Sequence, residues 1–87
     1  MCEIKDLARI FRALGNETRL RILMMIKDGE RCVCEIVSAI ERAQPTVSIH
    51  LRKLEDLGIV SSRKEGKSVY YRIVDDRVIA IIKMLCI

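Results

Sequence analysis

Apolar residues recur at helical spacing through the first half of the chain. The spacing over residues 4–14 predicts an amphipathic helix that Gly15 ends. Asn16 is a favourable N-cap for a second helix over about 17–27, which is apolar around most of its circumference and is therefore expected at the centre of the fold. Residues 30–34 are expected to be a short extended segment, followed by a short helix over about 34–40. This half of the chain is predicted to be helical.

The pattern changes in the second half. Pro45 is well placed in the first turn of a helix that continues to about residue 57, where Gly58 closes it. Two short β-prone segments, 59–63 and 68–73, flank a polar turn and predict a hairpin. Asp75 is expected to cap a final helix with apolar residues over a wide arc. The predicted order is therefore four helices, a hairpin and a helix.

Length and composition exclude several classes of protein. A chain of 87 residues forms one domain at most, and so short a chain often needs a metal, a disulfide or a partner to complete its core. The longest unbroken apolar runs have five residues, Ile22–Ile26 and Val78–Ile82, so we expect no membrane span. The N-terminus does not resemble a secretory signal, and the cytoplasm is the expected location. With one His, no glycine-rich phosphate loop and no paired acids, an enzyme is not expected.

The net charge of +4 is concentrated in one stretch of the chain. Residues 1–41 carry seven basic and seven acidic side chains, and residues 73–87 carry two of each. The stretch 42–72 carries three acids against seven basic residues, which are Arg42, Arg52, Lys53, Arg63, Lys64, Lys67 and Arg72. Clustered positive charge is typical of a surface that binds a polyanion, although a solvated basic face would look the same.

The helix expected over 45–57 favours the polyanion interpretation. Val47, Leu51 and Leu54 share one face of its helical wheel and are predicted to be buried. The opposite face is cationic and hydroxylic, with one β-branched residue. Such a face suits a DNA major groove, where Arg, Ser and Thr bond base edges or phosphates and an apolar group can contact a thymine methyl. The candidate contacts are Gln44, Pro45, Thr46, Ser48, Ile49, Arg52 and Lys53.

The hairpin supplies a second basic surface. Two helices joined by a short turn and followed by a basic hairpin indicate a winged helix-turn-helix. Arg63, Lys64, Lys67 and Arg72 are predicted to contact phosphates, with Gly66 in a positive-φ turn position. Tyr70 and Tyr71 point to opposite faces of the strand, so one is expected in the core, and the sequence does not say which. His50 lies beside the buried stripe, where we expect a nearby carbonyl to satisfy it.

Four segments together resemble the ArsR/SmtB family of bacterial and archaeal repressors: LGNETRLRIL (14–23), ERCVCEIVSAI (30–40), AQPTVSIHLRKLEDLGIV (43–60) and RKEGKSVYYRI (63–73). The resemblance implies a mainly α fold with a small β-hairpin wing, in one winged helix-turn-helix domain over 1–87. It further implies a homodimer through helices at 4–14 and 75–86, a helix-turn-helix over 34–57 and a wing over 59–73. Such proteins typically repress resistance operons and leave double-stranded operator DNA when an ion binds.

The cysteines are the candidate effector site. In the family, a pair such as Cys32 and Cys34 forms the core of a thiolate site for As(III), Sb(III), Cd(II), Pb(II) or Zn(II), and no obligatory cofactor is implied. Arsenite sensors often carry a third Cys where this chain has Val37. Related cadmium and lead sensors recruit N-terminal cysteines, which makes Cys2 the third candidate ligand, with Cys86 weaker. Because residues i and i+2 of a helix lie 200° apart, chelation by Cys32 and Cys34 is expected to require an extended or unwound first turn.

Four alternatives remain open. The same DNA-binding surface could serve a regulator that responds to oxidation through Cys32 and Cys34, or a regulator with no effector. The fold could also serve as a protein-interaction module that contacts no DNA. The cysteines themselves could be incidental buried thiols. A steep loss of DNA affinity with salt would exclude the interaction module, because each neutralised phosphate contributes about −0.9 to the log–log slope.

Overall fold

The computed structural model describes residues 3–86 and follows the predicted order of elements, with one short strand added. Helices α1 (Ile4–Leu14) and α2 (Glu17–Ile26) are followed by strand β1 (Arg31–Cys32), then α3 (Val33–Ala39) and α4 (Gln44–Asp56). Strands β2 (Val60–Glu65) and β3 (Ser68–Ile73) form the hairpin, and α5 (Asp76–Leu85) completes the fold. No helix in this part of the chain is long and apolar enough to cross a membrane.

Local signals set the ends of these helices. The side chain of Asn16 accepts a hydrogen bond from the Arg19 amide, and that of Asp75 accepts one from the Arg77 amide, as expected of N-caps. Helix α4 begins at Gln44, one residue earlier than expected, so Pro45 lies within its first turn. Gly58 and Gly66 adopt φ of +76° and +61°, which allows the chain to turn after α4 and at the hairpin tip.

The sheet contains a pairing that the hydrophobic pattern did not predict. Its strand order is β1-β3-β2, with both pairs antiparallel. Cys32 pairs with Tyr70 of β3, and Tyr70 pairs on its other side with Arg63 of β2. The extended segment predicted before α3 is therefore a third strand, and it joins the cysteine pair to the hairpin.

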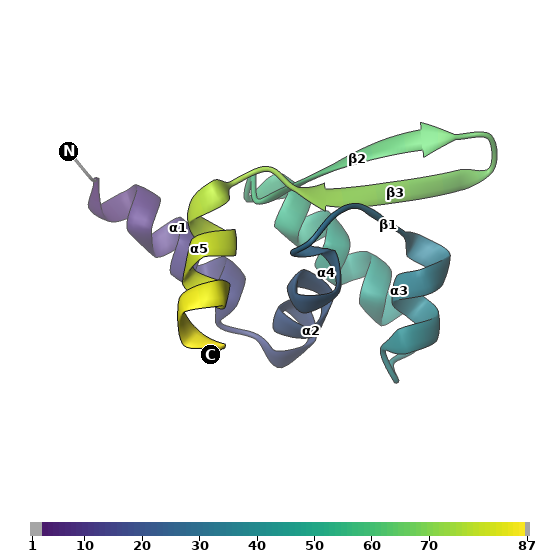
Figure 1. Cartoon of the computed structure of the whole chain (residues 1–87), viewed down its shortest axis with the longest axis horizontal. Helices are drawn as coiled ribbons and strands as arrows, with labels where there is room; N and C mark the ends of the chain where they lie inside the picture. The colour runs from purple at the N-terminus through teal and green to yellow at the C-terminus, as the bar shows by residue number, and fades with distance from the viewer. Residues whose placement is uncertain (1–2, 87) are drawn as a thin grey trace.

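One apolar core unites all five helices and the hairpin. The predicted buried stripe of α4, Val47, Leu51 and Leu54, is at most 1% exposed. The remaining core residues are Ile10, Ala13, Ile22, Leu23, Ile26, Ile36, Ile40, Ile59, Val60, Ile73, Val78 and Ile82. In Figure 1, α1 and α5 lie side by side at one end of the molecule and the hairpin extends toward the other, above α3. An ion pair of 2.9 Å between Arg77 and Asp6 joins α5 to α1.

Candidate DNA-binding and effector site

Helix α4 presents the face that the helical wheel predicted for DNA. Six of its seven candidate contacts, Gln44, Pro45, Ser48, Ile49, Arg52 and Lys53, are exposed, and Thr46 is half-buried. Ile49 is 66% exposed, although it is a large β-branched residue. Within the described residues, neither Arg52 nor Lys53 forms an ion pair or a side-chain hydrogen bond. The two cationic groups are therefore available to a polyanion.

The hairpin contributes three open cations and one that is engaged. Lys64, Lys67 and Arg72 are exposed, as a phosphate-contacting wing requires. Arg63 is also exposed, but its guanidinium donates to Glu30 and to Glu65 and lies over the Tyr70 ring. The sequence placed Arg63 among the DNA contacts without showing this engagement. Tyr71 packs against the core, which answers the question of the two tyrosines.

A buried cation fixes the position of α4 against the N-terminal helices. Arg19 is 9% exposed and donates to the carbonyl oxygens of Ala13 (3.0 Å) and Arg12 (2.7 Å) at the end of α1. Its Nη1 lies 3.3 Å from Nδ1 of His50 on α4. The partner of His50 is thus a guanidinium rather than the carbonyl that we expected. Arg19 was not identified from the sequence as a functional residue. A signal was present, because Arg19 lies three residues before Ile22 and four before Leu23, and therefore on the same buried face of α2.

This contact predicts a pH dependence of stability. Burial and then the charges of Arg19 and Lys53 lower the pKa of His50. The unfolded chain therefore takes up this proton first as pH falls through about 6.5, and the folded state progressively loses stability below that value. Urea unfolding of the protein between pH 7.5 and 5 should show this loss, and the His50→Gln variant should lose stability less steeply. Equal slopes for the two proteins would contradict the assignment.

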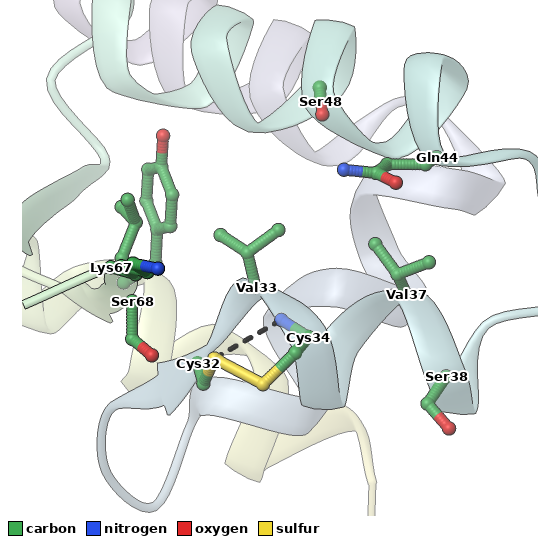
Figure 2. Close-up of a pocket in the computed structure, with 11 residues that line it drawn as sticks. Cys32, Val33, Cys34, Val37, Ser38, Gln44, Ser48, Lys67 and Ser68 are labelled. Carbon is green, nitrogen blue, oxygen red and sulfur yellow. Dashed lines mark hydrogen bonds between the residues drawn. A yellow bond between two sulfur atoms is a disulfide. The ribbon is translucent and has the colours of Figure 1, made fainter.

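Cys32 and Cys34 meet at the start of the helix-turn-helix. Cys32 is extended, with φ −66° and ψ 144°, and serves as the N-cap of α3, while Cys34 lies in the first turn. Their Cα atoms are 5.2 Å apart and their sulfurs are joined as a disulfide, as Figure 2 shows. Of the two expected arrangements, an extended or an unwound first turn, the structure has the extended one. The helix does not unwind, because Cys32 precedes it and belongs to β1.

The same residues cap α3. The sulfur of Cys32 accepts a hydrogen bond from the Cys34 amide (3.2 Å), and the Glu35 carboxylate accepts one from the Cys32 amide (3.4 Å). Together these bonds form a capping box in which a cysteine takes the place usually held by Ser or Thr. Any change in the chemistry of the Cys32 sulfur therefore acts directly on the first turn of the helix-turn-helix.

A cavity of about 660 Å³ joins the cysteine pair to the DNA-facing residues. It is lined by residues of α3, α4 and the hairpin, and Figure 2 shows Val33 and Val37 pointing from α3 toward Gln44 and Ser48 of α4. Its lining residues are Cys32, Val33, Cys34, Val37, Ser38, Gln44, Ser48, Lys67, Ser68, Val69 and Tyr71. The candidate effector and DNA-contact residues thus belong to one continuous region.

Of the other two cysteines, the structure describes Cys86 alone. Cys2 lies outside the described residues. Cys86 is exposed, and its sulfur is 3.9 Å from that of Met24 on α2. Over residues 3–86, no three His, Cys, Asp or Glu side chains gather as an ion site would require. The described part of the chain therefore brings two cysteine sulfurs together at the pair.

Comparison with known proteins agrees with this geometry. The profile of the bacterial regulatory protein, arsR family, matches residues 16–62. An uncharacterized HTH-type transcriptional regulator of Methanocaldococcus jannaschii is 49% identical over 90% of this chain and 89% of its own length. A cadmium resistance transcriptional regulatory protein CadC homolog of Staphylococcus aureus is 46% identical over 84% of this chain, which spans 61% of that protein.

A solved structure shares the whole arrangement of helices and wing. The homodimeric winged helix-turn-helix DNA-binding domain of a possible ArsR-family regulator from Mycobacterium bovis superposes with a TM-score of 0.84. It is 35% identical to this chain, and the match covers 94% of this chain and 76% of that one. Because the family profile covers more than half of the sequence and a relative 49% identical spans 90% of it, the chain belongs to the ArsR family, whose members are winged helix-turn-helix regulators of transcription and not enzymes.

Proposed function

We propose that the protein is a homodimeric repressor that binds operator DNA through α4 and the hairpin and leaves it when a thiophilic ion binds Cys32 and Cys34. The observation that carries this proposal is the position of the cysteine pair at the N-cap of α3, beside a cavity lined by Gln44, Ser48 and Lys67. A regulator of this kind acts where the DNA is, so the cytoplasm is its proposed location.

The DNA-binding part of the proposal rests on charge and shape. Arg52 and Lys53 are exposed on the outer face of α4, and Lys64, Lys67 and Arg72 are exposed on the hairpin. A recognition helix in the major groove reads base edges, and a wing beside it contacts the phosphates. Base edges can be contacted by amide, hydroxyl and apolar groups, which this face provides through Gln44, Thr46, Ser48 and Ile49.

The dimer is supported by an apolar surface at the other end of the molecule. Ile4 and Phe11 of α1 are 78% and 60% exposed, and Met84 and Leu85 at the end of α5 are 70% and 78% exposed. An apolar surface of this kind is typical of an interface. Two copies joined there would present two α4 helices to successive half-sites about one turn of DNA apart.

This interface can be tested with one substitution. The Phe11→Glu variant should be monomeric in analytical ultracentrifugation and bind DNA at least about tenfold more weakly, because it places two charges in an apolar interface. An Arg12→Glu variant on the neighbouring, exposed position serves as a control for added negative charge. A Phe11→Glu protein that remains dimeric would exclude α1 from the interface.

The ion-responsive part rests on the chemistry of the pair. When reduced, the two sulfurs can hold one soft ion without unwinding α3, since Cys32 is already extended. Cys2, outside the described residues, is proposed as a third ligand. Thiolates can coordinate all five candidate ions, which are As(III), Sb(III), Cd(II), Pb(II) and Zn(II). The cadmium resistance regulator related to this chain favours the choice of Cd(II) as the first ion to test.

The test is an anisotropy titration of a fluorescent duplex from the region upstream of the gene. Cd(II) or arsenite added to the reduced protein should lower its DNA affinity by about 5- to 150-fold, the usual range of allosteric coupling. An ion that binds but leaves DNA affinity unchanged would refute the sensing role and leave the DNA-binding role in place.

An oxidation-responsive regulator is the second candidate, and the Cys32–Cys34 disulfide favours it. In that function hydrogen peroxide accepts two electrons and two protons from the two thiols, which yields the disulfide and two water molecules. Comparing the DNA affinity of the ion-free protein in reductant and in peroxide distinguishes this function from ion sensing. A peroxide effect without an ion effect would favour it.

A further inference from the structure

The exposed Arg63 side chain is held across the sheet by two carboxylates. Its Nε donates to Oε2 of Glu30 at 2.9 Å, and its Nη1 donates to Oε2 of Glu65 at 2.8 Å. The guanidinium lies 4.6 Å from the centre of the Tyr70 ring. Arg63 is on β2, Tyr70 is on β3, and Glu30 directly precedes β1, so this contact spans all three strands.

Glu30 is also close in sequence to the proposed effector site. It lies two residues before Cys32, and β1 is attached to β3 by only two residue pairs, Arg31 with Tyr71 and Cys32 with Tyr70. An exposed ion pair alone usually contributes little to stability. Nε and Nη2 of Arg63 donate to the two carboxylate oxygens of Glu30. This bidentate pair, with the Tyr70 ring beside it, adds to the short ladder that attaches β1 to the hairpin.

We propose that Glu30 is a positioning residue that fastens the wing to the cysteine-bearing strand through Arg63, so that the wing follows any movement of Cys32. The role in signalling rests on the proposed ion response, whereas the attachment of β1 does not. The wing lies over α3 (Figure 1), so an ion bound at the cysteine pair would displace the phosphate-contacting residues Lys64 and Lys67 as well as the recognition helix. Arg63 then has a structural role, and the other wing cations contact DNA.

The attachment can be tested without ion or DNA. Amide hydrogen exchange of the reduced protein should be faster in the Glu30→Gln variant at residues 31–32 and 70–71, by roughly twofold to fivefold. Glu65→Gln is the matched control, because Glu65 also binds Arg63 but lies at the hairpin tip. Unchanged exchange in Glu30→Gln, or the same increase in both variants, would overturn the proposal.

The signalling role needs a second measurement. In the Glu30→Gln variant, the ratio of the DNA affinity without Cd(II) to that with Cd(II) should fall at least about threefold. Cd(II) binding, measured by the absorption of the thiolates, should stay unchanged. Exchanging the charges, in a Glu30→Arg and Arg63→Glu double variant, should restore the ratio that each single exchange reduces. A loss caused by the substitutions themselves, and not by the missing ion pair, would not be rescued in this way.

The outcomes separate this inference from the proposed function. A wild-type protein that ignores Cd(II) refutes ion sensing, and hydrogen exchange then decides the attachment alone. A wild-type protein that responds, with an equal ratio in Glu30→Gln, supports ion sensing and overturns the signalling role of Glu30.

Discussion

Replacing Cys34 with serine is expected to abolish the effect of Cd(II) on DNA affinity and to leave the affinity of the ion-free protein within about twofold of the wild type. A hydroxyl is a poor ligand for a soft ion, and removal of one sulfur leaves Cys32 as the one candidate ligand at the pair. Cys34 is exposed and its side chain does not cap α3, so the fold should tolerate the change. Anisotropy titration of a fluorescent duplex with and without Cd(II) measures the response.

Cys86→Ser is the matched control. Cys86 is also exposed, but it contacts Met24 and does not line the cavity beside the pair. The variant should therefore retain the full response. A Cys34→Ser protein that still leaves DNA on adding Cd(II), or a Cys86→Ser protein that does not, would contradict the assignment of the ion site.

Replacing Arg52 with alanine is expected to weaken binding to the upstream duplex by at least about thirtyfold. An Arg side chain bonded to a guanine edge is worth about 1–3 kcal/mol, and a dimer would lose this interaction at both half-sites of the operator. The loss should be smaller on a duplex of unrelated sequence, since contacts to base edges carry the specificity. Comparing the two duplexes at one salt concentration measures this difference.

Two variants control this experiment. Arg21→Ala removes an exposed arginine of α2 that pairs with Glu17, and should leave DNA affinity unchanged. Lys53→Ala should weaken both duplexes similarly and reduce the log–log salt slope by about 0.9 for each phosphate that the variant no longer neutralises. If Arg21→Ala weakened binding as much as Arg52→Ala, the outer face of α4 would not be the contact surface.

Much of the fold could be predicted because it is encoded locally. Helical periodicity located α1, α2 and α4, and the caps Asn16 and Asp75 fixed where helices begin. The buried stripe of α4 followed from the wheel alone, and with it the exposed face. The hairpin followed from two β-prone segments around Gly66.

The features that could not be predicted join residues far apart in sequence. Arg63 and Glu30 are separated by 33 residues, and His50 and Arg19 by 31. Neither pairing leaves a periodic signal, because it depends on how whole elements pack. The extended segment that contains Cys32 was predicted, but its pairing with Tyr70 of β3 was not. These contacts connect the candidate ion site to the wing and anchor α4, so they bear directly on function.

The most direct test is to measure how the reduced, ion-free protein binds a fluorescent duplex as salt is raised from about 50 to 200 mM. The proposed function predicts saturable binding of two chains per duplex at low salt, with an affinity that falls steeply as salt increases. A protein that stays monomeric and does not bind the duplex at the lowest salt, or whose affinity does not depend on salt, would contradict it.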